Sequence, residues 1–559
     1  MLQISRFSLK LTLVLFIVLM FVSLPLGFDQ HHSGLILSSL NEFDTALSLK
    51  GGYPFNQYGP AWILIFHFPL TQAPFATYYL YVKALGMALI LICFAITYLL
   101  ARNYLTRMWS LLPILLMCIT YPFFTGFLPW PSLVVMPIVP YVAHTVIRIQ
   151  DPSGVTRRRG VLMVSCAGIL TGVALLSRVQ IGLLLFAFTI VLLIVAKTQF
   201  RKQYLLSYMA GQFVFLFAIF NFLFEYDWLR SALFDQFVMG FKYLTGDKST
   251  FPVPTRTILI VLMMVVIYVL VQSNRVENLL KSNICLQRMS RILLPSTLIV
   301  AILAISPIDR LFYRIWISFL LAVLIISVFE VFRDICASMR IFQTPRAILI
   351  VYSAVAFTQV WPLFDQMHAW WGISPLAVLS VLYLRQIRSR LYLPTKRVQS
   401  LTLIVAVIIL LSVSASKVLD SFAKSTELET PGLRGNFVDP EVASEINAID
   451  DFFRSYIPQG SKVLNLCPDG NVFFTRHRQI SAARNIVFWS TMKDNLDLTQ
   501  HLISASPSFV VICNFTPFTS QLYNFFDFQN EIASKTIPGG RLLGEVLLRE
   551  SRKIQIYAP

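Results

Sequence analysis

A polar segment near the start of the chain gathers side chains that can transfer protons or bind ligands. They are Asp29, His31 and His32, with Asp44 and Tyr58 further along the same segment. The segment, residues 28–60, lies directly between two long apolar stretches. A carboxylate at a membrane edge indicates chemistry on a lipid-linked substrate. The structural alternative is that Asp29 caps the N-terminus of a following helix, a position that aspartate favours.

The composition predicts the elements that must position this segment. Of 559 residues, 56% are hydrophobic and only 13% are charged, and the mean hydropathy is +0.68, which excludes an ordinary soluble protein. Apolar stretches near the length that a membrane-spanning helix needs recur along the chain. They are 11–27, 78–101, 109–126, 133–147, 161–177, 181–196, 205–224, 258–271, 292–305, 315–332, 347–362, 372–384 and 401–415. We therefore predict a polytopic membrane protein of about thirteen transmembrane helices, the first of which lacks a signal-peptide cleavage pattern.

The positive charges predict the orientation of these helices. With thirteen alternating spans, most lysines and arginines of the membrane region fall on the side of the N-terminus, including the run Arg157, Arg158 and Arg159. Because positive loops stay in the cytoplasm, the N-terminus is expected inside and the C-terminal part outside. The net charge of +18 is then a topology signal, and no nucleic-acid partner is needed to explain it.

The chain divides into two predicted domains. Residues 1–415 form the membrane domain, with long outer loops at 28–60 and 225–256, and residues 416–559 read as an extracytoplasmic (periplasmic) α/β domain. In the second domain a helix is expected at 440–456, buried strands at 462–467 and 508–513, and a closing hairpin at 541–557, which favours a partly parallel sheet. Neither a phosphate-binding loop nor a zinc-binding motif occurs in the sequence.

Several short sequences together resemble the GT-C glycosyltransferases, integral-membrane enzymes that use polyprenyl-phosphate sugars. They are DQHHSG at 29–34, GGYP at 51–54, NQYGP at 56–60, SRVQIG at 177–182, QVWP at 359–362, WWG at 370–372 and SPSFVV at 506–511. In many of these enzymes two histidines precede an acid, whereas this chain has Ser33 there, so the catalytic role falls on Asp29. The resemblance implies a GT-C fold with an outer α/β domain.

The resemblance also implies a reaction. A sugar would pass from a polyprenyl-phosphate donor to a glycan or lipid acceptor on the outer face of a bacterial plasma membrane, with inversion in one displacement. Asp29 would act as the general base. The side chains expected to contact substrate are His31, His32, Asp44, Tyr58, Asp365, Trp370 and Trp371.

Cationic side chains at the outer level are expected to bind the donor phosphate. Arg178 is the first candidate because it interrupts an apolar run, where a charge is costly and usually functional. The alternative is an arginine that snorkels from the tip of a helical hairpin. His368, Arg310 and Arg314 are further candidates. The indoles beside His368 could instead be interface anchors.

Some alternatives stay open from the sequence. The chain could be a transporter or flippase of lipid-linked glycans, although charge is scarce in its cytoplasmic half, or an outer-face polysaccharide polymerase or ligase. A divalent cation bound by Asp29, His31 and His32 is also open, but these residues lack a tight ligand spacing. Cys467 and Cys513, at the ends of two predicted strands, form either a disulfide or two buried thiols.

Overall fold

A computed structural model of the chain describes most of its helices and the larger part of its C-terminal sheet. The described ranges are 2–26, 78–122, 130–151, 155–223, 309–337, 344–360, 366–390, 396–430, 432–467, 506–514, 525–549 and 552–559, with short pieces at 61, 65, 258, 261–266, 480–481, 500 and 502–504.

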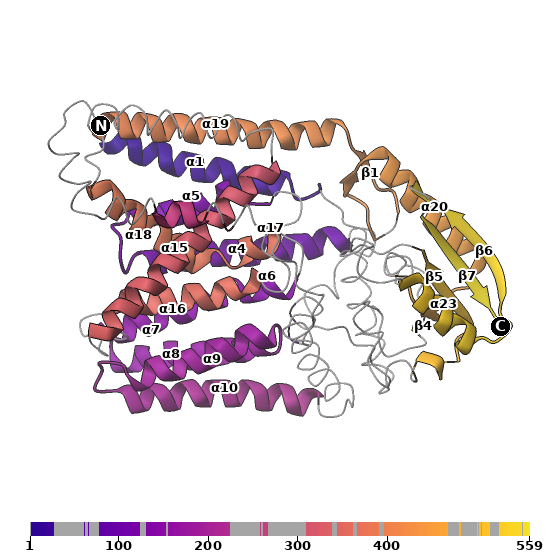
Figure 1. The fold of residues 1–559 in the computed structure, drawn as a ribbon, viewed down its shortest axis with the longest axis horizontal. Coiled ribbons are helices and arrows are strands. Elements are labelled where there is room, and N and C mark those ends of the chain that lie inside the picture. Colours follow the sequence, from indigo (N-terminus) through magenta and orange to yellow (C-terminus); the bar gives the residue numbers. More distant parts are fainter. Residues whose placement is uncertain are drawn as a thin grey trace.

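Apolar helices that run side by side form a bundle (Figure 1). They are α1 (Leu2–Val22), α4 (Tyr78–Ala101), η2 (Trp109–Leu111), α5 (Leu112–Ile119), α6 (Pro131–Val135), α7 (Ile138–Ile149), α8 (Arg157–Leu175), α9 (Val179–Ile194), α10 (Arg201–Leu223), α15 (Asp309–Ala337), α16 (Pro345–Phe357), η4 (Thr358–Val360), α17 (Gln366–Trp371), α18 (Ser374–Arg390) and α19 (Lys396–Ala423). Among the described helical segments, three are long and apolar enough to cross a membrane, namely Tyr79–Ala101, Pro131–Ile149 and Arg157–Leu175. The chain is a polytopic helical membrane protein.

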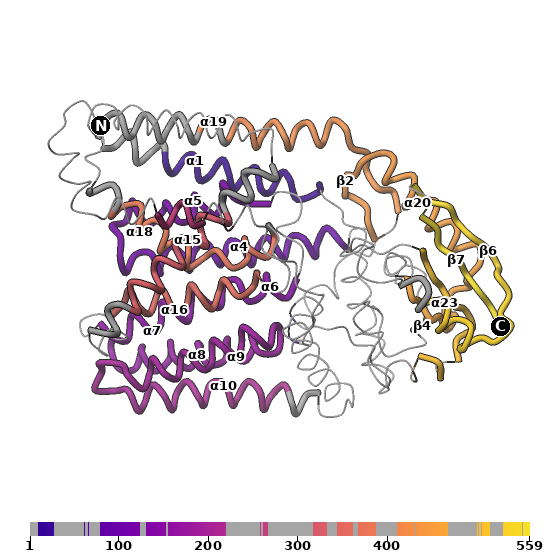
Figure 2. Tube along the Cα trace, viewed as in Figure 1, coloured from indigo at the N-terminus to yellow at the C-terminus, as the bar shows by residue number. Residues whose placement is uncertain are grey.

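The predicted spans can be compared with these helices. Half of the stretch at 258–271 and all of the stretch at 292–305 lie outside the described residues, and each of the others contains a described helix. The total of thirteen therefore stays a prediction. Helices α1 and α19, from distant parts of the sequence, lie side by side at one edge of the bundle (Figure 2).

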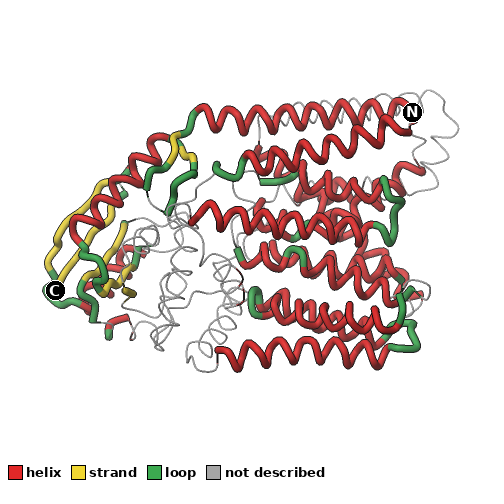
Figure 3. Tube along the Cα trace, turned by 180° about the vertical axis from the view of Figure 1, so that it is seen from behind, coloured by secondary structure: helices red, strands yellow, loops and turns green. Residues whose placement is uncertain are grey.

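The two ends of the bundle differ. The turn between α8 and α9, together with α6 and α17, lies at the end that faces the C-terminal segment, which we call the near end (Figures 1 and 3). The N-terminus lies at the opposite, far end. Since α8 ends at the near end, its arginine-rich start, Arg157 to Arg159, lies at the far end.

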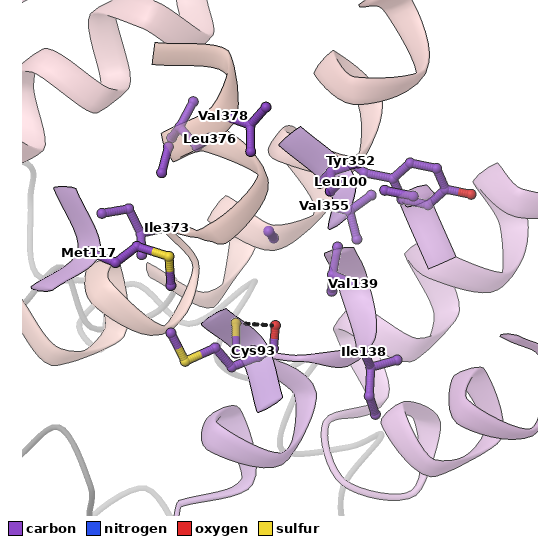
Figure 4. Close-up of a cluster of buried hydrophobic side chains, with 14 of the residues drawn as sticks. Cys93, Leu100, Met117, Ile138, Val139, Tyr352, Val355, Ile373, Leu376 and Val378 are labelled. Atoms are coloured by element: carbon purple, nitrogen blue, oxygen red, sulfur yellow. Dashed lines mark hydrogen bonds between the residues drawn. The ribbon is translucent and has the colours of Figure 1, made fainter. Parts of the chain in front are cut away.

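Interdigitated apolar side chains form the core of the bundle. Figure 4 shows part of it, where Cys93, Met117, Val139, Tyr352 and Leu376 come from five different helices and are at most 1% exposed. Several polar atoms inside this core are paired, although others, such as Ser380 Oγ, have no hydrogen-bond partner among the described residues. Among the paired atoms, Thr97 Oγ1 on α4 lies 2.7 Å from Ser374 Oγ on α18. Such pairing is stabilising because an unpartnered polar group is costly in an apolar core.

Glycine allows α8 and α10 to pack closely along their length. A Cβ atom at Gly168 would lie 2.1 Å from the carbonyl oxygen of Tyr208, and one at Gly211 would lie 2.2 Å from that of Ser165. Across the same interface Tyr208 Oη donates to Thr171 Oγ1 at 3.0 Å. Small residues commonly permit this close approach between membrane helices.

The C-terminal segment contains a mixed five-stranded sheet, drawn with its helices in Figure 3. Its elements are β3 (Lys462–Asn465), β4 (Ile480–Ser481), β5 (Phe509–Cys513), β6 (Arg541–Leu547) and β7 (Lys553–Ala558), with α20 (Pro440–Tyr456) and α23 (Phe525–Thr536). The strand order is β4-β3-β5-β7-β6, parallel across the first three strands and antiparallel across the last three. The predicted helix 440–456, the partly parallel sheet and the closing hairpin are therefore present.

Candidate functional site

The structure describes only some of the predicted site residues. Asp29, His31, His32, Asp44, Tyr58 and Asp365 lie outside the described residues. Arg310 and Arg314 lie in the first two turns of α15, and their side chains are outside what the structure describes. The site is therefore built from Arg178 and His368 and from the backbone that leads into and out of the 28–60 segment.

Arg178 lies in the tight connection between α8 and α9. Its backbone is extended (φ −140°, ψ 97°) and occupies the N-cap position of α9. Its backbone N–H donates to Ala174 O at 2.7 Å, and its own carbonyl accepts from Gly182 N at 3.0 Å. These bonds join the end of α8 to the start of α9 and determine where the Arg178 side chain begins.

The Arg178 side chain points into protein. The residue is only 8% exposed, and its Nη1 donates to Ser132 Oγ on α6, which is fully buried. A guanidinium that snorkelled to water from a hairpin tip would be exposed. The snorkelling alternative is therefore wrong for this residue, and a buried cation at the near end needs polar or anionic partners.

A glycine brings the two helices of this hairpin together. A Cβ atom at Gly182 would lie 2.2 Å from Leu175 Cα, so a larger residue would force α9 away from α8. The sequence motif at 177–182 thus has a packing reason as well as a chemical one.

The 28–60 segment leads back to the same hairpin. Ala61, the residue after it, is buried, and its N–H donates to the carbonyl of Leu176 at 3.1 Å. This bond places the exit of the segment two residues from Arg178 in the chain. The segment and Arg178 are separated by more than a hundred residues in sequence, and tertiary structure joins them.

His368 lies beside the same short helix. Helix α6 packs against α8 and against α17, which carries His368, so α6 lies between the two cationic candidates. His368 is 4% exposed, and its ring makes an edge contact with Trp371 at a centroid distance of 5.4 Å.

Both indoles near His368 are buried within the bundle. Trp370 Nε1 donates to Met117 O at 2.9 Å, and the Trp370 ring meets that of Tyr121 at 5.1 Å. The carbonyl of Trp371 accepts from Gln359 Nε2 at 3.2 Å. In this structure Trp370 and Trp371 therefore hold α17 against α5 and η4, and they fix the position of His368.

Two polar residues of this region escaped the sequence analysis. Ser132 gave no signal, because a single serine in an apolar stretch is common. Lys83 did give one, since it is the only charged residue in the 24-residue helix α4. It is fully buried near the start of that helix.

Metal ligands and cysteines complete the predicted site residues. Within the part of the chain that the structure describes, no three His, Cys, Asp or Glu side chains come close enough to bind a metal ion. Cys467 and Cys513 form a disulfide that joins the ends of β3 and β5, with a Cα–Cα distance of 5.2 Å.

Comparison with known proteins gives similarity in structure only. No protein-family model and no curated protein sequence matches the chain. The chain is similar to ArnT from Cupriavidus metallidurans in the apo state (10% identity, TM-score 0.49) and bound to undecaprenyl phosphate (10%, 0.46), with 98% of this chain and 97% of ArnT covered in both. It is also similar to the oligosaccharyltransferase AglB from Archaeoglobus fulgidus in complex with an inhibitory peptide and a dolichol-phosphate (11%, 0.46), with 89% of this chain and 69% of AglB covered.

Both are GT-C membrane glycosyltransferases. All three likenesses have TM-scores below 0.5.

Proposed function

We propose that this chain is a membrane glycosyltransferase that moves a sugar from a polyprenyl-phosphate donor to a glycan or lipid acceptor. The observation that supports it most is the buried guanidinium of Arg178 at the near end, beside the exit of the segment that carries Asp29. A general base and a phosphate-binding cation are the two groups that the transfer needs.

The proposed reaction is a single displacement. Asp29 takes the proton of the acceptor hydroxyl as its oxygen attacks the anomeric carbon of the donor sugar. The bond from that carbon to the phosphate oxygen breaks, so the configuration inverts and polyprenyl phosphate leaves with the electron pair. No covalent sugar–enzyme intermediate forms.

Arg178 would stabilise the leaving group. Negative charge develops on the phosphate as the bond breaks, and a guanidinium can donate two parallel hydrogen bonds to phosphate oxygens. Its bond to Ser132 and the helical hairpin beneath it hold the guanidinium in place before the donor arrives. Such prior placement is what makes electrostatic stabilisation effective in catalysis. His368, on the other side of α6, is proposed as a second phosphate contact.

The proposal includes an orientation in the plasma membrane. The far end would face the cytoplasm, and the near end and residues 416–559 would lie outside. The arginine-rich start of α8 at the far end and the N-terminus there support it, because positive charge stays on the cytoplasmic side. The full bundle would have thirteen spans.

Asp29→Asn is the variant that tests the function. Asparagine is as good an N-cap as aspartate but does not accept a proton, so folding should be unchanged while transfer from a labelled polyprenyl-phosphate sugar falls by roughly 100-fold. Asp29→Ala serves as the comparison for the capping role.

If Asp29→Asn keeps near-normal transfer while Asp29→Ala folds poorly, Asp29 is a cap, and the base must be sought at Asp44 or Asp365. If purified protein moves intact lipid-linked glycan across vesicle membranes without transferring sugar, the enzyme proposal is overturned in favour of a transporter.

A further inference from the structure

Lys83 is a buried cation at the near end of α4 that the proposed reaction does not use. It is 0% exposed, and its Nζ donates to the carbonyls of Leu24 at 3.1 Å and Leu26 at 3.2 Å. The ammonium also lies 5.0 Å from the centre of the Tyr79 ring on the same helix. A charge inside a membrane protein is costly unless it has such partners.

The carbonyls that Lys83 binds lie just past the end of α1. The last carbonyls of a helix have no partner within the helix, and a cation is favoured at that end by the helix dipole. Lys83 comes from a neighbouring helix, about sixty residues away in sequence, and binds the backbone of the turn that follows α1. Ser23 binds a carbonyl of the helix itself, with Oγ donating to Met20 O at 2.8 Å.

The opposite edge of the same short segment is held by the C-terminal part of the chain. The carbonyl of Pro25, between the two that Lys83 binds, accepts from Phe437 N at 2.9 Å, and Leu26 pairs with Phe437 in an isolated parallel bridge. Phe437 belongs to β2 (Phe437–Val438), which pairs with β1 (Thr426–Glu427). Three successive carbonyls are thus bound alternately by Lys83 and β2.

The start of α4 is tied to the same C-terminal part. Tyr79 N donates to Gly432 O at 3.2 Å, and the Tyr79 side chain belongs to the apolar core of the C-terminal segment. A Cβ atom at Gly435 would lie 3.2 Å from Leu80 Cδ2. The end of α1, the start of α4 and β2 therefore form one packed junction, and Asp29 follows it by only three residues.

We propose that Lys83 is a positioning residue that anchors the entry of the 28–60 segment and thereby places Asp29 for proton transfer. The inference rests on the proposed function of Asp29. Two of the ammonium's donors are bound to backbone carbonyls of that entry, which is the geometry of an anchor. The exit is anchored separately, through Ala61 and Leu176.

Lys83→Met is the test variant, because methionine keeps much of the aliphatic stem and removes the ammonium. Lys197→Met, at an exposed lysine between α9 and α10 at the far end, is the matched control. We expect Lys83→Met to lower kcat for sugar transfer about 10-fold or more while the KM for the donor changes less than about twofold. The control should match the unsubstituted protein.

An engineered disulfide distinguishes an anchoring role of Lys83 from a direct role in the reaction. Leu26→Cys with Phe437→Cys would link the bridge partners covalently in the Lys83→Met protein. If Lys83 only anchors, the oxidised form should regain most of the lost kcat and lose it again on reduction, with Lys83→Met alone as the reduction control. If the disulfide forms and kcat stays low, Lys83 acts on substrate and the proposal is overturned. Should Lys83→Met alone not fold, it is introduced into the cross-linked protein, where unchanged kcat supports the anchor and a further loss contradicts it.

A measurement without transfer keeps the two proposals apart. The rate at which a maleimide labels Gln30→Cys should rise severalfold in the Lys83→Met protein and stay unchanged in the Lys197→Met protein. Equal rates in all backgrounds would overturn the anchor even if Asp29 proves to be the base. A raised rate together with fully active Asp29→Asn would support the anchor and overturn the catalytic role of Asp29.

Discussion

Arg178 is a site residue that both the sequence and the structure single out. Its charge in an apolar run marks it in the sequence, and its burial against Ser132 excludes a purely surface role. A guanidinium buried at the near end is suited to an anionic ligand, because it can donate two parallel hydrogen bonds to phosphate oxygens.

Arg178→Gln should lower transfer by roughly 100-fold, since one preorganised donor to a developing anion usually contributes that much. Arg178→Lys keeps the charge but not the two-pronged geometry, and should lie between Gln and the unsubstituted protein. Steady-state kinetics with a labelled lipid-phosphate sugar measures both.

Ser132→Ala is the control for the position of the guanidinium. It removes one hydrogen-bond partner of the guanidinium and leaves the charge, so it should cost only a few-fold in kcat. Full activity of Arg178→Gln would show that the buried cation serves folding alone.

The pair α8 and α10 shows how an element is held in place near the site. Gly168 faces the backbone of α10, whereas Gly160 faces the phenol ring and hydroxyl of Tyr204. A side-chain end can move aside, but a backbone carbonyl in a packed helix cannot without moving the whole helix.

Gly168→Ala should therefore destabilise the protein by roughly 1–3 kcal/mol despite the better helix propensity of alanine. Gly160→Ala should cost less. The apparent melting temperature of both variants in the same detergent measures the difference, and equal temperatures would show that α8 and α10 are not closely packed there.

At the scale of the whole molecule, one junction connects the membrane helices with the C-terminal sheet. The end of α1, the start of α4 and β2 meet there, and α19 enters the C-terminal segment beside it, with the rings of Phe422 and Phe437 5.3 Å apart. A displacement of the sheet that moved β2 would therefore also displace the entry of the 28–60 segment.

The disulfide is a prediction about the whole chain, because it reports the compartment of the C-terminal segment. Intact mass after alkylation in denaturant should show two additional alkylated cysteines only when the protein is first reduced. Cys467→Ser should lower the free energy of unfolding of this segment by about 4 kcal/mol, as expected for a link between residues 46 apart. An unchanged alkylation count would mean that both thiols are free in the cell.

The orientation can be tested independently. A reporter that is active only outside the cytoplasm should be active when fused after Ser416 and inactive when fused near Arg158. The reverse pattern would place Arg178 and the near end in the cytoplasm and overturn the proposed site.

Local patterns in the sequence determined the class of the fold and most of its elements. Apolar runs predict membrane helices because their length and composition must match the bilayer. The helix 440–456 and the final hairpin followed from periodicity alone. Arg178 could be singled out because the cost of burying a charge is a property of one residue and its neighbours in sequence.

Only the tertiary structure decided which distant groups meet. Helix packing brings together groups that are far apart in sequence and form hydrogen bonds. These bonds join Arg178 to Ser132, Ala61 to Leu176, and Lys83 to Leu24 and Leu26. The burial of Trp370 and Trp371 was decided in the same way. These contacts depend on which faces of the helices are pressed together, and no local pattern of residue types carries that information.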